Sequence, residues 1–470
     1  MTSSTPIADF VRQYSASGTV RLHMPGHKGV PFLGCEPLDL TEIAGADELY
    51  DAEGIIAQSE ANAARLFDTA ATYYSTEGSS QCIRAMLFLA MQAAPQGAGR
   101  PVLLAARNAH KALLYAAALL DLEVCWLWPQ GPGASLCSCP VTPEALEARL
   151  AQLRGRRLCG VYLTSPDYLG YMQDIAALSA VCRRWGLPLL VDNAHGAYLP
   201  FVPGGSRHPI ALGADLCCDS GHKTLPVLTG GAYLHLGPRF AAQPQTVRGA
   251  MALFGSTSPS YLILQSLDLC NQYLAQGYGE RLAACTARLS SLAGELNAAA
   301  QARGCPVPLV LTGPEQEPLK LTLDAVALGR TGHWLADQLR ACGMECEYAD
   351  GRNLVLMFTP ENPPEDAARL RSALLDVVQQ AAVPAAPPEE PWAEFEALAR
   401  EQTPVRSIRE AVLGPAERLP AQQALGRVCA LPTVSCPPAI PIAVSGERIG
   451  PAALALMRRY GITDLDVCKE

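Results

Sequence analysis

The sequence is poor in charged residues and has no long basic run. Only 17% of its 470 residues are Asp, Glu, Lys or Arg, whereas about a quarter is typical of globular proteins. Lys and Arg number 36 against 45 Asp and Glu, which gives a formal net charge of −9. Proteins that bind nucleic acids by charge are usually basic, so we expect no nucleic-acid partner.

The sequence also lacks a recognisable membrane span or signal peptide. The apolar stretch from Ala112 to Leu120 is far shorter than the roughly 20 residues needed to cross a bilayer. The N-terminal MTSSTPIADFVRQYSASG has no basic segment followed by an apolar one. We therefore expect a soluble, cytoplasmic protein with no membrane partner.

Cysteine, in contrast, is frequent. The 17 cysteines are odd in number and spread over a long chain, unlike those of a small disulfide-rich secreted domain. The closely spaced pairs are Cys137/Cys139, Cys217/Cys218 and Cys342/Cys346. None has a matching second pair or a histidine at zinc-finger spacing. We expect reduced, mostly buried thiols and no metal site.

Strand and helix patterns alternate from about residue 55 to 290. Strands such as Leu158–Thr164 and Leu187–Asp192 are apolar along most of their length, as expected when both faces of a sheet are covered. This alternation predicts an α/β fold with a mostly parallel, doubly wound sheet.

We expect four parts along the chain. Residues 1–40 read as a mostly irregular N-terminal arm, 41–295 as the major domain, 296–380 as a smaller α/β unit and 392–470 as a C-terminal unit. The proline-rich segment Ala381–Pro391 reads as a linker. Tyr261–Ala300 reads as a long helical stretch. Three strands are expected in the small unit, at Leu309–Leu311, Leu319–Leu323 and Leu354–Phe358.

Four polar clusters follow predicted strands, where open α/β sheets bind ligands. The first, Glu77–Ser80, combines a glycine with two hydroxyls at a helix start, which suits a phosphate group. A simple serine N-cap explains it equally well. In the second, Asp192 closes a buried strand, where a carboxylate requires a cationic partner.

The other two clusters contribute a lysine and a histidine. Lys223 lies in a stretch with few charges and is a candidate Schiff-base nucleophile, although a surface lysine is an equal alternative. His110 follows another strand and could be structural. Together, phosphate hydroxyls, Asp, His and Lys describe a pyridoxal-phosphate (PLP) site: the phosphate needs the helix start, the pyridinium nitrogen a carboxylate and the aldehyde a lysine.

These residues stand in motifs that resemble the Orn/Lys/Arg decarboxylase family. The motifs are SGHKTLPVLTGGA, VDNAHGAY, RNAHKA, HMPGHKG and STSPSY. The resemblance runs from Arg21 to about Glu447 and is to the shorter members, which lack an N-terminal wing domain. It implies the aspartate-aminotransferase-like fold (fold type I) and decarboxylation of arginine, lysine or ornithine to the corresponding polyamine-pathway amine and CO₂.

The resemblance also implies residue roles. Lys223 would hold PLP, Asp192 would pair with its ring nitrogen, and His110 and Ala194 would pack on opposite faces of the ring. His195 would line the site. The implied phosphate ligands are Ser79, Ser80, Ser220 and His222.

A homodimer or larger homo-oligomer is implied as well, with the site at the subunit interface. Thr257 and Ser258 resemble the segment that reaches a neighbouring subunit's phosphate. Asp47 and Glu48, which resemble part of a family segment, are candidates for binding the far end of a basic substrate, with a solvated charged loop as the alternative.

Two departures from the family pattern stand out. Glu77 precedes the phosphate hydroxyls, where an acid is repulsive, and Cys436 stands where the family often has a tyrosine near the substrate. Two other functions stay open: a different PLP reaction such as transamination, with Arg352 as a candidate carboxylate ligand, and a non-catalytic PLP-binding protein.

Overall fold

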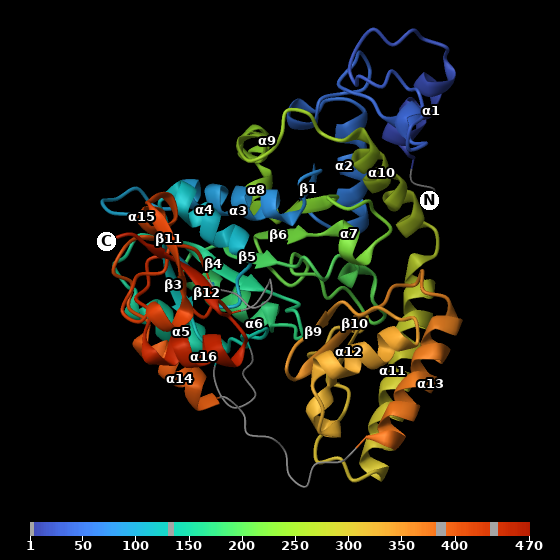
Figure 1. The fold of residues 1–470 in the computed structure, drawn as a ribbon. Coiled ribbons are helices and arrows are strands. Elements are labelled where there is room, and N and C mark those ends of the chain that lie inside the picture. The colour runs from blue at the N-terminus through green and yellow to red at the C-terminus, as the bar shows by residue number, and fades with distance from the viewer. Residues whose placement is uncertain (1–3, 130–135, 382–391, 433–439) are drawn as a thin grey trace.

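A seven-stranded sheet forms the centre of the computed structural model, which describes residues 4–129, 136–381, 392–432 and 440–470. The strand order is β1-β7-β6-β5-β4-β2-β3 (Figure 1). The strands are β1 (Ala71–Ser75), β2 (Val102–Ala106), β3 (Glu123–Leu127), β4 (Leu158–Thr164), β5 (Leu189–Asp192), β6 (Leu216–Asp219) and β7 (Ala232–Leu236). Only β7 runs antiparallel to its neighbours within this sheet, so the predicted mostly parallel α/β sheet is confirmed.

Helices cover both faces of this sheet. Leu103 packs into a core shared with α3 (Ser79–Ala93), α4 (Lys111–Leu120) and α9 (Pro244–Leu253). Leu104, the next residue of β2, points to the opposite face and packs with α5 (Pro143–Gln152) and α6 (Ile175–Arg184). Burial of both faces explains why these strands are apolar at every position. Two short helices, α7 (Gly221–Thr224) and α8 (Pro238–Ala241), flank β7.

The N-terminal region is more ordered than the sequence suggests. It contains a helix, α1 (Pro6–Ala16), which packs on α2 (Ile55–Phe67) and α10 (Tyr261–Ala275). The backbone amides of Ile7 and Ala8 donate to the Asp268 carboxylate at 2.9 and 3.0 Å. This buried acid satisfies the free amides of the helix start, which local sequence could not reveal.

The helical stretch after α9 is also interrupted. The predicted helix over Tyr261–Ala300 consists of α10 and α11 (Tyr278–Ala302). The break falls at Gly277, whose φ of 72° lies in the left-handed region that glycine adopts without strain.

The smaller α/β unit follows α11 (Figure 1). Its antiparallel sheet has the order β8-β10-β9, with β8 (Lys320–Asp324), β9 (Tyr348–Ala349) and β10 (Asn353–Met357). Helices α12 (Gly332–Ala341) and α13 (Pro364–Gln380) pack on it. The strand expected at Leu309–Leu311 is wrong, since this segment makes only an isolated bridge between Val310 and Leu323. The 3₁₀ turns are η1 (Glu36–Leu38), η2 (Leu49–Asp51), η3 (Leu199–Phe201), η4 (Ala325–Leu328) and η5 (Ala421–Gln423).

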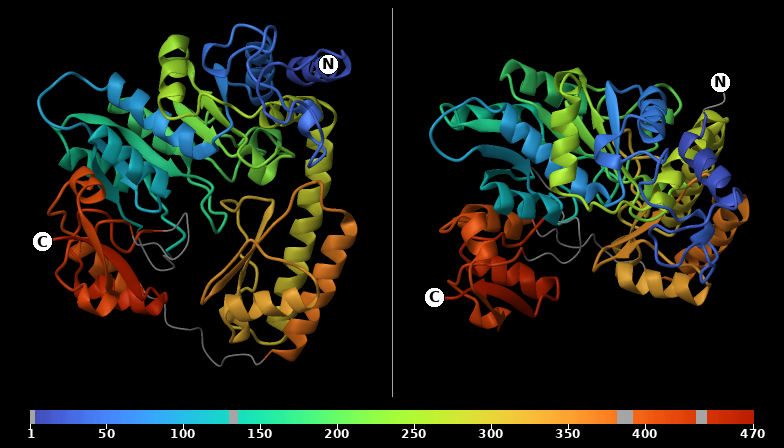
Figure 2. Two further views of the ribbon diagram at one scale, coloured as in Figure 1. Left: turned by 45° about the horizontal axis from the view of Figure 1, so that its top comes forward. Right: turned by 90° about the horizontal axis from the view of Figure 1, so that it is seen from above.

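The C-terminal unit packs beside the β3 edge of the main sheet (Figure 2). It contains α14 (Trp392–Glu401), α15 (Ile408–Leu413), α16 (Pro451–Arg459) and an antiparallel pair, β11 (Ala416–Pro420) and β12 (Asp464–Cys468). Arg107, fully buried just after β2, binds the Glu447 carboxylate through two nitrogens at 2.7 and 2.8 Å. This ion pair ties the unit to the strand that leads to His110.

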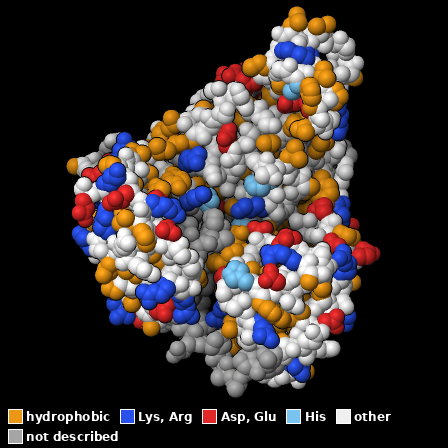
Figure 3. All heavy atoms as spheres, in the orientation of Figure 1, with side chains coloured by type: hydrophobic (Ala, Val, Ile, Leu, Met, Phe, Trp, Pro, Cys, Tyr) orange, Lys and Arg blue, Asp and Glu red, His pale blue; other side chains and the backbone are white. Residues whose placement is uncertain are grey.

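Basic and acidic side chains are interspersed over the face shown in Figure 3. Among the described residues, the cysteines are free thiols, and most of them are buried. In the same part of the chain, no helix combines the length and apolar character that a membrane crossing requires.

Candidate active site

A cavity of about 290 Å³ opens where β4, β5 and β6 end. It brings together nine of the side chains that the sequence predicts for the site: Ser79, Ser80, His110, Asp192, Ala194, His195, Ser220, His222 and Lys223. Thr257 and Ser258 do not line it and are exposed on the loop before α10. The cavity therefore unites segments more than 100 residues apart in the sequence, as strand ends of a parallel sheet do.

Asp192, the last residue of β5, is buried at the base of the cavity. Its carboxylate accepts hydrogen bonds from the Tyr162 hydroxyl at 3.0 Å and the Ala194 amide at 3.2 Å. These donors fix the orientation of a carboxylate that is held in a largely apolar setting. Burial, together with the adjacent Asp192, raises the pKa of Tyr162 well above its ordinary value, which keeps this hydroxyl a donor.

Lys223 and His195 face each other across the cavity, with Nζ 3.1 Å from Nε2. Burial lowers the pKa of Lys223, opposed by the charges of Asp192 and Glu347. Burial also lowers the pKa of His195 well below its usual value, and the positive charge of Lys223 acts in the same direction. A neutral imidazole can accept a proton from the lysine, and a larger fraction of the lysine is in its nucleophilic amine form.

The opposite end of the cavity is formed by the start of α3. Gly78 precedes the helix with a φ of 71°, and the Ser220 hydroxyl donates to Ser79 Oγ at 2.9 Å. Two hydroxyls and the free amides of a helix start favour an anion there. His222 points its Nδ1 at the Gly231 carbonyl, 3.0 Å away, so this side chain is anchored to the segment before β7.

His110 is the N-cap of α4. Its Nδ1 accepts a hydrogen bond from the Ala112 amide at 3.2 Å, which fixes the ring at the cavity wall. Burial lowers the pKa of His110 below its ordinary value. A neutral, oriented imidazole is suited to packing flat on an aromatic ring.

The structure adds residues that the sequence analysis missed. Thr164, Pro166, Thr229 and Gly230 also line the cavity. The Tyr168 ring packs edge-on against His195 at 5.2 Å, and its hydroxyl donates to Glu347 Oε1 at 2.8 Å. Glu347 is exposed just before β9 and forms no ion pair within the described part of the chain. Thr229 and Gly230 belong to the motif SGHKTLPVLTGGA, whereas nothing local in the sequence marks the other positions.

Three other predicted candidates lie elsewhere. The Asp47 carboxylate accepts from the Gly54 and Ile56 amides at 2.8 and 2.9 Å, so it caps the start of α2. Glu48 is exposed and does not line the cavity. Arg352 binds Asp324 at 2.7 Å and does not line the cavity either.

The structure places one of the two residues that depart from the family pattern, Glu77 and Cys436. Glu77 lines the cavity, and its Oε1 accepts from the Ser256 amide at 3.3 Å. The acid is thus turned toward the loop before α10. Cys436 lies outside the described residues.

The residues present fit PLP. Anion donors at one end, a buried carboxylate at the other and a lysine between them match the phosphate, ring nitrogen and aldehyde of that cofactor. His195 Nδ1 is buried and has no hydrogen-bond partner among the described residues. An orphaned polar atom of this kind is typical of a site that a bound molecule completes.

Comparisons with known proteins give matches over most of the chain. The profile of the Orn/Lys/Arg decarboxylase major domain matches residues 5–302, and that of the C-terminal domain of the same family matches residues 393–460. Arginine decarboxylase of Bacillus subtilis is 29% identical over 462 residues, which cover 95% of this chain and 91% of that protein. Arginine decarboxylase of Halalkalibacterium halodurans is 27% identical, over 98% and 94% of the two chains.

Solved structures support the fold. The constitutive lysine decarboxylase of Escherichia coli has a TM-score of 0.75 at 17% identity, covering 99% of this chain and 82% of that one. Lysine decarboxylase of Francisella novicida gives 0.77 at 16% identity, with coverage of 99% and 81%. A cysteine desulfurase of Thermococcus onnurineus gives 0.54 at 13% identity, with coverage of 80% and 92%. The fold is that of fold type I PLP enzymes.

Proposed function

The chain belongs to the Orn/Lys/Arg decarboxylase family, and from this membership we propose that it removes the α-carboxylate of arginine, lysine or ornithine as CO₂. The reaction class, PLP-dependent decarboxylation, follows from the family and its relatives. The product would be the corresponding amine, a precursor or member of the polyamines. The observation that carries the proposal is the 3.1 Å approach of Lys223 Nζ to His195 Nε2 in the cavity that also contains Asp192.

In this proposal, four segments hold the cofactor. Lys223 would bind it covalently through Nζ, and Asp192 would keep its ring nitrogen protonated. His110 and Ala194 would pack on the two ring faces. The phosphate would be held by Ser79, Ser80, Ser220 and His222. When bound, PLP supplies an electron sink for the pair of electrons that CO₂ leaves on Cα.

Lys223 and His195 would handle the protons. Once CO₂ has left, Cα must gain a proton, and the amine–imidazole pair holds one inside the cavity. Its delivery to Cα would complete the product. The lowered pKa of Lys223 makes this amine a better proton donor, and the lowered pKa of His195 keeps its imidazole neutral.

Glu347 would recognise the basic end of the substrate. Its carboxylate is exposed, is held by Tyr168 next to His195, and raises the pKa of Lys223 by its charge. It does not line the cavity but is connected to it through the contact of Tyr168 with His195. A distal ammonium or guanidinium group would find there a carboxylate that forms no ion pair among the described residues.

A homodimer or larger homo-oligomer is part of the proposal. Thr257 and Ser258 are exposed on the loop before α10, where they would reach the phosphate bound by a second copy. We expect the enzyme to work in the cytoplasm, because free thiols such as those described persist in reducing compartments.

The purified protein, incubated with PLP and arginine, lysine or ornithine, tests the reaction. We expect equal amounts of CO₂ and amine from at least one of the three. Keto-acid formation without CO₂ would instead indicate transamination, and cofactor binding without turnover of any of the three would indicate a non-catalytic protein.

A lysine substitution tests the site separately. We expect Lys223→Ala to abolish the visible absorbance of covalently held PLP, since the nucleophile is removed. Activity should fall at least a thousandfold. Lys111→Ala is the matched control, because Lys111 also follows a histidine but does not line the cavity. Full absorbance in Lys223→Ala would mean that another lysine carries the cofactor.

A further inference from the structure

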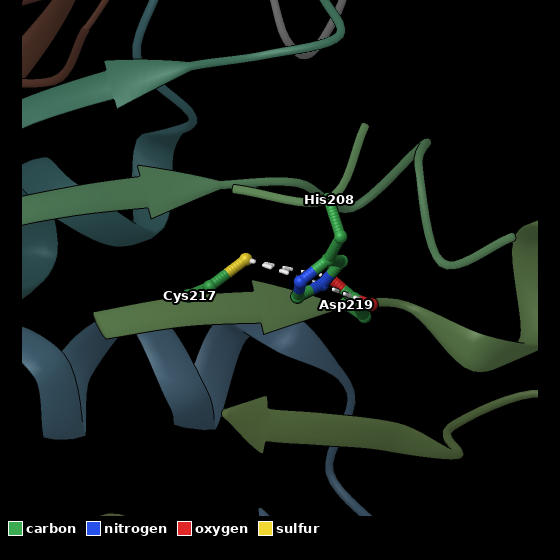
Figure 4. Close-up of side chains that lie close together, drawn as sticks. All are labelled: His208, Cys217 and Asp219. Atoms are coloured by element: carbon green, nitrogen blue, oxygen red, sulfur yellow. Dashed lines mark hydrogen bonds and ion pairs between the residues drawn. The ribbon is translucent and has the colours of Figure 1, made fainter. Parts of the chain in front are cut away.

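Four metal-ligating side chains lie together behind the cofactor cavity. His208, Cys217, Asp219 and His235 are all fully buried. Cys217 and Asp219 alternate along β6 and so point to the same face of the sheet. His235 pairs with Cys217 across the antiparallel β6–β7 ladder, and His208 comes from the loop before β6. We call these four residues the His–Cys–Asp cluster; Figure 4 shows three of them.

The separations between the ligand atoms of His208, Cys217 and Asp219 are close to those of a tetrahedral metal site. Bonds of about 2.0–2.3 Å from zinc to N, O and S place neighbouring ligands roughly 3.3–3.8 Å apart. The nitrogens Nε2 of His208 and His235 lie 3.1 and 3.3 Å from Asp219 Oδ2. Cys217 Sγ lies 3.5 Å from Asp219 Oδ1 and 3.8 Å from His208 Nε2. Charge-assisted N–H···O bonds are shorter, at about 2.7–2.9 Å.

His235 lies at the border of the cluster, beside Asp219. Its Nε2 is buried and lies 3.3 Å from Asp219 Oδ2, without meeting hydrogen-bond geometry among the described residues. Its other nitrogen, Nδ1, contacts the Thr72 hydroxyl at 2.8 Å.

The Asp219 carboxylate is also held in place by a hydrogen bond. Asp219 Oδ1 accepts from Asn193 Nδ2 at 2.7 Å, which leaves Oδ2 directed at the two imidazoles. A thiolate, a carboxylate and the neutral imidazole of His208 would balance the charge of a divalent ion. Such a mixed N/S/O set favours zinc among the common divalent metals.

We propose that the His–Cys–Asp cluster binds a zinc-class divalent cation in a buried, structural site. His208, Cys217 and Asp219 would supply the protein ligands, and His235 would border the site beside Asp219. Asp219 directly precedes Ser220, and its partner Asn193 directly follows Asp192. The ion would therefore fix the two turns that present Asp192 and Ser220 to the cofactor.

The competing arrangement has no metal and shares protons instead. In it, Nε2–H of His208 donates to Asp219, and the Ile210 amide donates to His208 Nδ1, a long contact of 3.4 Å. In a metal site Nδ1 would carry the proton. The two arrangements thus differ in metal content and in the charge of Cys217, both of which are measurable.

Metal analysis of the purified holoenzyme, after growth with added zinc and gel filtration with a chelator, decides between them. We expect about one zinc per chain. Protein grown with cobalt should show thiolate-to-cobalt absorbance in the near ultraviolet. Cys217→Ser should lose this absorbance and most of the metal, whereas Cys159→Ser, a buried strand cysteine far from the cluster, should keep both.

A wild-type zinc content below roughly one tenth per chain, with no change in thermal stability on adding zinc, would overturn the proposal. So would undiminished metal in Cys217→Ser. If Cys217→Ser fails to fold, the wild-type metal content and the cobalt spectrum still decide. Neither readout depends on decarboxylase activity, so the result is separate from the proposed function.

Discussion

Glu347 is an exposed acid whose charge acts on Lys223, and it offers a direct test of substrate class. We expect Glu347→Gln to raise KM for a basic amino acid about twofold to fivefold, with little change in kcat. The size of this KM change follows from the energy of an exposed ion pair, which is about 0.2–1 kcal/mol. Steady-state kinetics with arginine, lysine and ornithine measure it.

Glu345→Gln is the matched control for this variant. Glu345 is also exposed, two residues earlier, but it pairs with Arg340 at 2.9 Å on the outer side of the small unit. Its removal should leave KM unchanged. Equal KM values for Glu347→Gln and the unmodified enzyme would mean that another group binds the distal cation.

Glu77 is the second acid whose effect can be measured. It lines the cavity beside the expected phosphate ligands, where its negative charge opposes that of the phosphate. We therefore expect Glu77→Gln to bind PLP about threefold more tightly at low salt, with a smaller difference at high salt. Fluorescence titration of the cofactor-free protein measures this. Weaker binding would show that the contact with Ser256 matters more than the repulsion.

At this scale, the sequence could predict residues that belong to contiguous motifs. Lys223, Asp192 and His110 each follow a predicted strand, so their meeting in one cavity follows from parallel-sheet topology. Tyr162 and Glu347 could not be predicted, because each acts through a contact made by tertiary folding. The capping of α2 by the Asp47 carboxylate could not be predicted for the same reason.

At the scale of elements, the buried ion pair of Arg107 and Glu447 connects the main sheet to the C-terminal unit. Its loss should lower the stability of the folded protein strongly. Arg107 also stacks on Trp126 and Trp128, with its guanidinium carbon 4.8 and 4.6 Å from the two ring centres. Removing Glu447 leaves a buried cation without its anion. We expect Glu447→Gln to destabilise the folded protein by about 3 kcal/mol, measured by guanidinium denaturation.

A surface pair provides the comparison. Glu123 and Arg156 are 2.6 Å apart but partly exposed, so Glu123→Gln should cost less than about 1 kcal/mol. A similar loss in both variants would mean that Arg107 gains water or another partner when Glu447 is changed.

Elements whose pattern is set locally were predictable, and elements set by tertiary contacts were not. The strands of the main sheet are apolar throughout because both faces are buried, which is readable from sequence. The break at Gly277 was missed, since one glycine in a helical pattern is compatible with continuation. Leu309–Leu311 has strand-like composition but finds only the bridge at Val310.

At the scale of the whole molecule, the exposed apolar side chains are unevenly distributed. The region after α1 carries six of them: Val20, Leu22, Met24, Val30, Phe32 and Leu33. Figure 3 shows hydrophobic side chains gathered over this end of the molecule. Contiguous apolar surface of this kind is characteristic of an interface. In the proposed homodimer, a second copy would cover it.

Sedimentation tests this arrangement. We expect a species of about twice the 49.9 kDa chain mass. The double variant Leu22→Asp with Leu33→Asp should shift this species toward monomer. Each change puts a charge on a residue that is 90% or 91% exposed in the single chain. Leu413→Asp, also exposed but in the C-terminal unit, should leave the dimer intact. If Thr257 and Ser258 reach a partner's cofactor, the monomeric variant should also bind PLP more weakly, in parallel with dissociation. A monomeric wild-type enzyme that retains PLP would contradict both expectations at once, since the site would then be complete within one chain.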